Sequence, residues 1–165
     1  MAKTRFKGTE VNTSGELPAV GTAAPAFTLV GTDLGERSLK DFAGKKVVLT
    51  VNPSYDTGVC QATARKFNAE LGERGDTVVL MVSADLPFAQ KRFCEADGLE
   101  HVVPLSTFRS TFAHDYGLEL LDGPLQGLTA RAVVVVDEHG TVTYTELVPE
   151  ITEGPNLEAA AAALG

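Results

Sequence analysis

Hydrophobic residues gather in three nearly continuous runs along the chain. The runs are Lys45–Asn52, Thr77–Ala84 and Ala132–Val136. Short runs of this kind, rich in valine and leucine, are typical of strands that are covered on both faces of a sheet. The sequence therefore predicts three buried strands.

Between and after these runs the apolar positions follow helical spacing. Ala64, Phe67 and Leu71 predict an amphipathic helix of about four turns that starts near Cys60 and ends near Gly75. A second helix is expected from Asp85-Leu86-Pro87 to a stop at Gly98. Further helices are expected over 106–116 and, at the end of the chain, over 156–164.

Weaker patterns complete the picture. Residues 1–16 predict a small hairpin or an irregular arm, 27–30 and 101–105 predict strands, 38–42 a short helical turn, and 142–147 a strand that pairs after the turn at 138–140. No linker or repeat divides residues 1–165. The order of elements predicts one α/β domain, with a central mixed sheet flanked by helices.

Composition and charge exclude several classes of function. The 22 acidic side chains outnumber the 14 basic ones, for a formal net charge of −8. Because no basic cluster could neutralise phosphates, a role in binding nucleic acid is not expected. No apolar run approaches the roughly 18 residues of a membrane span, and no apolar signal segment follows the basic N-terminus. We expect a cytoplasmic protein that does not enter a membrane.

The segment Pro53–Cys60 is the strongest candidate for a site. It follows the first apolar run, and ligands of such folds collect at the carboxyl ends of the strands. Cys60 falls in or near the first turn of the predicted helix, where backbone N–H groups lack intrahelical partners and the helix dipole is positive. Both effects favour the thiolate, which is the nucleophilic form. We therefore expect Cys60 to be reactive.

The neighbouring residues each allow two interpretations. Thr57 could cap the helix through its hydroxyl or hold a substrate oxygen beside the sulfur. Pro53 could bend the exit of the strand or shield a pocket from water. Arg131 could be a solvated residue at the start of a strand or could stabilise charge at the site. Cys94 could be a buried apolar residue or a second reactive thiol, but the two cysteines form no CxxC motif.

The spacing Pro53-x-x-x-Thr57-x-x-Cys60 is similar to the active-site signature of the peroxiredoxins, which have a thioredoxin-like fold. Nearly the whole chain resembles one branch of that family, the bacterial thiol peroxidases of the atypical 2-Cys type. The motifs that carry this resemblance are Pro53–Cys60, Ser83–Ala89, Arg92-Phe93-Cys94 and Gly127–Val135, in that order.

The resemblance implies a role for each candidate residue. Cys60 would be the peroxidatic cysteine and Cys94 the resolving cysteine of an intramolecular disulfide. Thr57 would position the peroxide, Arg131 would stabilise the thiolate and the transition state, and Pro53 would shield the pocket. The resemblance also implies hydrogen peroxide and organic hydroperoxides as substrates, thioredoxin as the reductant, a homodimer, and no metal or cofactor.

Ionisation alone does not explain a fast peroxidase. Lowering a thiol's pKa from about 8.5 to about 6 raises the thiolate fraction roughly 30-fold at pH 7. Intrinsic nucleophilicity falls by roughly 10- to 20-fold over the same interval, if peroxide attack follows the slope of disulfide exchange. Preorganised donors for the leaving oxygen should therefore contribute more, and Arg131 and Thr57 are the candidates.

A disulfide between Cys60 and Cys94 requires their Cα atoms to lie within about 7 Å. Cysteines on two packed helices seldom satisfy this, so the sequence predicts local unwinding around one or both of them.

Three other functions are compatible with the residues. The chain could be a thiol–disulfide oxidoreductase or thioredoxin-like binding module, although it lacks CxxC. It could be a cysteine hydrolase that pairs Cys60 with His101, His114 or His139, or a non-enzymatic interaction protein in which both thiols are incidental.

Overall fold

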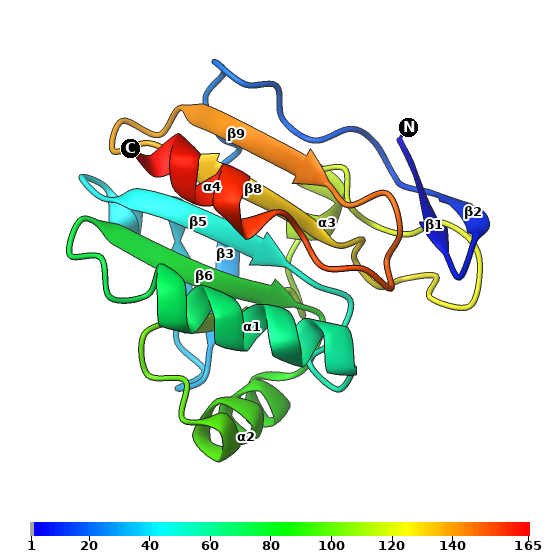
Figure 1. Cartoon of the computed structure of the whole chain (residues 1–165), viewed down its shortest axis with the longest axis horizontal. Coiled ribbons are helices and arrows are strands. Elements are labelled where there is room, and N and C mark those ends of the chain that lie inside the picture. The colour runs from blue at the N-terminus through cyan, green and yellow to red at the C-terminus, as the bar shows by residue number, and fades with distance from the viewer. Residues whose placement is uncertain (1) are drawn as a thin grey trace.

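The computed structural model describes residues 2–165, and its main feature is a seven-stranded mixed sheet with the strand order β4-β3-β7-β6-β5-β8-β9 (Figure 1). The three central strands β5, β6 and β7 are parallel, while β3, β8 and β9 run antiparallel to their neighbours in the sheet. The strands are β3 (Thr28–Gly31), β4 (Glu36–Ser38), β5 (Lys46–Val51), β6 (Thr77–Ser83), β7 (Val103–Ser106), β8 (Ala132–Val136) and β9 (Val142–Leu147).

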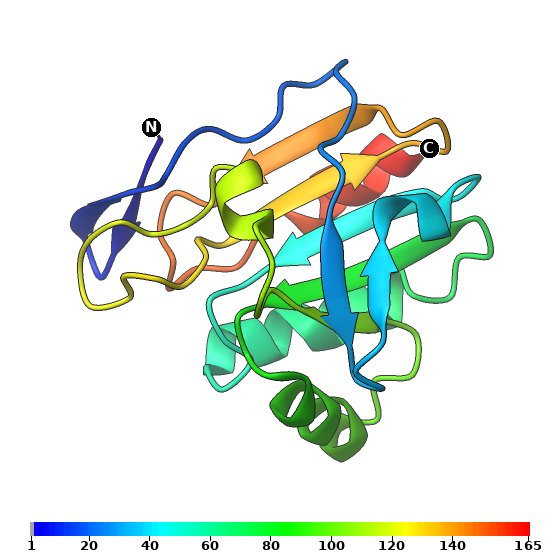
Figure 2. The same ribbon diagram turned by 180° about the vertical axis from the view of Figure 1, so that it is seen from behind.

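Helices cover both faces of this sheet. In Figure 1, α1 and α4 lie in front of the strands, and the view from behind in Figure 2 brings α3 and the short 3-10 helix η1 to the front. Phe93 and Cys94 of α2 pack into the apolar cluster that α1 and α4 form. The helices are η1 (Leu39–Phe42), α1 (Gly58–Glu70), α2 (Pro87–Asp97), α3 (Phe112–Asp115) and α4 (Leu157–Leu164).

Alternation along the central strands divides the core into two layers. In β8, Val133 and Val135 face α1 and α4, whereas Val134 and Val136 face the opposite side. All four are buried, because helices cover both faces. The three apolar runs of the sequence are therefore the central strands β5, β6 and β8, as the pattern predicts.

The N-terminal segment forms a separate antiparallel hairpin of β1 (Lys3–Phe6) and β2 (Thr9–Asn12). This confirms the hairpin expected at this end of the chain. Glu150 fastens the turn of the hairpin, since its carboxylate accepts hydrogen bonds from the backbone N–H groups of Lys7 (3.2 Å) and Gly8 (2.7 Å). The hairpin is thereby attached to the loop that follows β9.

Two predicted helices are shorter than expected. The first ends at Glu70 rather than near Gly75, because at Gly72 the chain meets the backbone of His101 too closely for any side chain. The third covers Phe112–Asp115 only, because Ser106 belongs to β7 and Arg109 has a φ of 54°, which no right-handed helix accommodates. The short strand β4 carries no apolar alternation, and the sequence pattern missed it.

Candidate functional site

The chain enters α1 from the carboxyl end of β5, and this junction positions Cys60. Thr57 is the N-cap of α1: its hydroxyl oxygen accepts a hydrogen bond from the backbone N–H of Cys60 (3.4 Å). The same hydroxyl donates to the backbone carbonyl of Ser54 (3.1 Å). Cys60 is fully buried and packs with Ala64 and Phe67. The predicted position of Cys60 at a helix start is confirmed, and so is the capping interpretation of Thr57.

Strand pairing brings Arg131 to the same place. β8 runs antiparallel to β5, and Ala132 pairs with Val51. Arg131, one residue before β8, therefore lies beside Asn52, one residue after β5. Its Nη1 donates to Asn52 Oδ1 (2.7 Å) and its Nε donates to the carbonyl oxygen of Ile151 (2.8 Å).

The Arg131 side chain is not solvated. This rules out the interpretation of Arg131 as a solvated residue at the start of a strand. The residue is only 2% exposed, and within residues 2–165 no carboxylate forms an ion pair with it. A buried guanidinium without an anionic partner is costly, so such groups are normally paired. Within residues 2–165, the site thus holds a positive charge that no carboxylate compensates.

A small apolar cavity lies at this guanidinium. It measures about 150 Å³ and brings together Arg131, Pro53 and Thr57. The remaining lining is largely apolar and comes from segments distant in sequence: Phe6, Ser54, Val59, Leu125, Leu128, Ile151 and Thr152. Cys60 itself does not line the cavity in this conformation. Phe6 of the hairpin and Ile151 were not predicted as site residues, and no sequence motif marks them.

Cys94 occupies a different setting. It lies on α2, is half-buried, and packs against the same apolar cluster as Cys60. Both cysteines are free thiols in this structure. Burial raises the pKa of the Cys94 thiol to about 11, and the charges of Asp97 and Glu95 act in the same direction. Cys94 therefore keeps its proton at neutral pH.

Three further residues connect the two cysteine-bearing segments, and the sequence reasoning did not find them. Asn52 Nδ2 donates to the Tyr55 hydroxyl (2.8 Å), so Asn52 bridges Arg131 and Tyr55. The Tyr55 ring stacks on Phe93, the neighbour of Cys94, and Asp85 binds the segment that carries Tyr55. Burial raises the pKa of Tyr55 well above its usual value, with smaller contributions from Cys60, Asp85 and Cys94.

The histidines do not support a cysteine hydrolase. His101, His114 and His139 are all exposed, whereas Cys60 is fully buried. The nearest partner of the His101 ring is Glu73 (3.3 Å). No cysteine–histidine pair is thus formed within residues 2–165.

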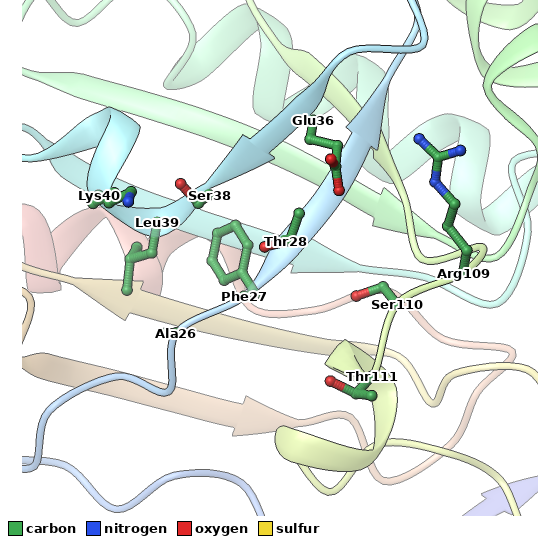
Figure 3. A pocket seen from close by; sticks show the side chains of 10 residues that line it. All are labelled: Ala26, Phe27, Thr28, Glu36, Ser38, Leu39, Lys40, Arg109, Ser110 and Thr111. Atoms are coloured by element: carbon green, nitrogen blue, oxygen red, sulfur yellow. The ribbon is translucent and has the colours of Figure 1, made fainter.

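A larger depression of about 470 Å³ lies near β3, β4 and the segment before α3 (Figure 3). Its lining includes Phe27, Glu36, Lys40 and Arg109, and neither cysteine nor Arg131 contributes to it. In Figure 3 the side chains of Lys40 and Arg109 lie at opposite ends and do not converge. Neither cysteine contributes to the depression, so the cavity at Arg131, next to the helix of Cys60, is the better candidate for thiol chemistry. No helix within residues 2–165 is long and apolar enough to cross a membrane.

Comparison with known proteins agrees with the fold. Residues 19–164 match the Redoxin family. The thiol peroxidase of Mycobacterium tuberculosis (strain ATCC 25618 / H37Rv) is 56% identical over 165 residues, which cover 100% of this chain and 99% of the relative. The thiol peroxidase of Corynebacterium glutamicum is 56% identical over 164 residues, or 99% of each chain. The crystal structure of a peroxiredoxin-like protein from Aquifex aeolicus aligns with a TM-score of 0.95 at 38% identity, covering 99% of this chain and 96% of that one.

These matches show that the fold is thioredoxin-like and that the chain belongs to the Redoxin family. Within that class it belongs to the thiol peroxidases, a branch of the peroxiredoxins, and is an enzyme with thiol-dependent peroxidase activity.

Proposed function

We propose that this enzyme reduces hydrogen peroxide and organic hydroperoxides through a Cys60 sulfenic acid and a Cys60–Cys94 disulfide, which thioredoxin reduces. The observation that carries the proposal is the buried Arg131 guanidinium. It has no carboxylate partner within residues 2–165, and Arg131 lines a cavity together with Pro53 and Thr57, at the start of the helix that bears Cys60. An anionic reactant at this position, such as a thiolate or the leaving oxygen of a peroxide, would compensate its charge.

In the first step the Cys60 thiolate attacks the nearer oxygen of the peroxide. The O–O bond breaks, its electron pair leaves with the distal oxygen, and that oxygen takes up a proton to give water or an alcohol. Sulfur is oxidised to the sulfenic acid. Within residues 2–165, Arg131 bonds to the protein through Nε and Nη1, so its remaining N–H groups would be the donors to the leaving oxygen once a peroxide is bound.

The bonds of Thr57 restrict how it can bind a peroxide. Its single hydroxyl proton is donated to the Ser54 carbonyl, and one of its lone pairs accepts from the Cys60 N–H. A second lone pair remains. Thr57 would therefore accept a hydrogen bond from the O–H of a hydroperoxide rather than donate one. Pro53, which is buried and has no N–H, would complete the wall that limits water.

In the second step the Cys94 thiol condenses with the Cys60 sulfenic acid. A disulfide forms and one water leaves, which balances the reaction. The two thiols are free here, on separate helices, so this step needs local unwinding that brings the Cα atoms within about 7 Å. Thioredoxin would then reduce the disulfide by exchange. We further propose that the enzyme works as a homodimer in the cytoplasm.

Two serine variants test these roles. In an assay with thioredoxin as the reductant and cumene hydroperoxide as the substrate, Cys60→Ser should lose peroxide consumption entirely. Cys94→Ser should still consume one equivalent per chain, followed at most by a slower second equivalent as the sulfenic acid is oxidised to the sulfinic acid, and then stop. Sustained turnover by Cys60→Ser would contradict the peroxidatic role, and sustained thioredoxin-dependent turnover by Cys94→Ser would contradict the resolving role.

A further inference from the structure

The loop that leads to Cys60 is fastened to the base of the helix that bears Cys94. Asp85, two residues before α2, accepts three hydrogen bonds on its carboxylate. Two come from the Cys60 loop: Ser54 Oγ donates to Oδ1 (2.7 Å) and the backbone N–H of Tyr55 donates to Oδ2 (2.7 Å). The third comes from Ser83 Oγ, which donates to Oδ2 (2.8 Å). One carboxylate thus joins the two segments.

A ring contact reinforces this junction. The Tyr55 ring is buried and stacks on Phe93 of α2, with ring centroids 5.5 Å apart and planes inclined by 11°. Phe93 is the residue before Cys94. The Ser54–Tyr55 segment therefore touches α2 at both its base and its middle. We call these contacts, from Asp85 to Ser54 and Tyr55 and from Tyr55 to Phe93, the clasp.

The Asp85 side of the clasp is firmly anchored. Ser106 Oγ donates to the backbone carbonyl of Asp85 (2.6 Å), and this fixes Asp85 to the end of β7. Gln90 of α2 donates from Nε2 to Ser83 Oγ (3.0 Å) and to the carbonyl of Leu105 (2.9 Å). These bonds hold Asp85 in place independently of the Cys60 loop, so losing the contacts to Ser54 and Tyr55 would release the loop while Asp85 stays fixed.

Opening of the clasp coincides with the movement that resolution requires. Cys60 is fully buried, Cys94 is half-buried, and the two are not bonded. The segment that links β5 to α1 is held at Ser54 and Tyr55, so an unwinding that carries Cys60 to Cys94 strains or breaks these contacts. While the clasp is closed, Thr57 and Cys60 keep the cap geometry described above.

We propose that Asp85 is a positioning residue that keeps the Cys60 loop folded and so delays formation of the Cys60–Cys94 disulfide. This inference rests on the proposed function. The sulfenic acid has two fates. It condenses with the Cys94 thiol and releases water, or it reacts with a second hydroperoxide, which is reduced to an alcohol while sulfur is oxidised to the sulfinic acid. A tighter clasp lengthens the life of the sulfenic acid and favours the second fate.

Asp85→Asn is the sharpest test because it keeps size and removes charge. The amide oxygen can still accept from the Tyr55 N–H, and the NH₂ group can donate to Ser54 Oγ if that hydroxyl turns. The variant therefore exchanges charge-assisted hydrogen bonds to the Cys60 loop for weaker neutral ones. Asp56→Asn is the matched control: Asp56 is exposed in the same loop, and its carboxylate makes no hydrogen bond within residues 2–165.

The experiment mixes each reduced protein with increasing cumene hydroperoxide, without reductant, and determines disulfide and sulfinic acid by intact mass. At equal peroxide, the ratio of disulfide to sulfinic acid should rise about three- to tenfold in Asp85→Asn, as expected when charge-assisted hydrogen bonds become weaker neutral ones. Ser54→Ala removes one clasp bond and should shift the ratio in the same direction by less. Asp56→Asn should match the wild type.

The outcomes separate the inference from the function on which it rests. An unchanged or lower ratio in both Asp85→Asn and Ser54→Ala, with a wild type that forms the disulfide, would overturn the clasp alone. A wild type that forms no disulfide would overturn both. Ser54→Ala keeps Asp85 in place, so it decides the question if Asp85→Asn does not fold.

Discussion

Cys60 and Cys94 pack against the same side of the sheet, yet their surroundings differ in almost every respect. Cys60 is fully buried at the first turn of α1, near a cavity with a buried guanidinium. Cys94 is half-buried on α2, and the acidic residues Glu95 and Asp97 surround it. Burial and these two charges raise the pKa of Cys94. The difference between the two settings fits the different roles that we propose for the two thiols.

The difference between the surroundings of Cys60 and Cys94 depends most on Arg131. Replacing it with alanine should lower the rate of peroxide attack about 10²-fold or more, the typical loss when one preorganised donor to a developing oxyanion is removed. The rate should be measured by rapid mixing with hydrogen peroxide, at a pH at which the Cys60 thiol of each variant is fully ionised.

Arg92→Ala is the matched control, since Arg92 is exposed on α2 and forms no ion pair within residues 2–165. It should react at the wild-type rate. If Arg131→Ala and the wild type were equally fast at full ionisation, Arg131 would have no part in charge stabilisation.

Replacing Asn52 should lower the rate of peroxide attack at Cys60 as well, but by less than replacing Arg131. It holds the guanidinium through a 2.7 Å bond to Nη1, and hydrogen bonds to charged groups contribute about 1.5–3 kcal/mol. Asn52→Ala should therefore slow peroxide attack roughly tenfold while Cys94 reacts with iodoacetamide as in the wild type. The corresponding control is Asn68→Ala, which removes the hydrogen bond that Asn68 accepts from the His101 N–H and lies away from the cavity. Equal losses in both variants would point to general destabilisation.

The smallest predicted effect concerns the pH dependence at Cys94. Its pKa is raised from 9.0 to about 11 in the folded protein, so the unfolded chain loses this proton first as the pH rises. The folded state then binds more protons than the unfolded state, and the free energy of unfolding should fall between pH 9 and about 11. Urea unfolding of the wild type and of Cys94→Ser over this range isolates the contribution. Parallel pH profiles of the two proteins would contradict the prediction.

Much of the fold follows from the sequence pattern. The apolar runs identify β5, β6 and β8, and Gly98, with its positive φ of 64°, ends α2 where the sequence predicts. Errors arise where a tertiary contact decides the boundary, as at Gly72 against His101. Such a contact joins segments that nothing in the local sequence connects.

The candidate site likewise combines residues that the local sequence predicts with residues that only tertiary contacts bring together. The spacing of Pro53, Thr57 and Cys60 is local and could be read from the sequence, whereas Arg131 required the resemblance to a family. Its burial depends on the pairing of Val51 with Ala132, and strand register cannot be read from either strand alone. Asn52, Tyr55 and Asp85 were missed for this reason: Asn52 binds Arg131 and Tyr55 binds Asp85, and these pairs meet only in the folded protein.

The most direct test of the central claim is a thiol count after one oxidation. Reduced protein receives one equivalent of cumene hydroperoxide, and free thiols and intact mass are then measured under non-reducing conditions. We expect that both thiols of each chain disappear and that the monomer becomes lighter by two hydrogens. Covalent dimers would contradict the intramolecular step, and unchanged thiols would contradict the peroxidatic role of Cys60.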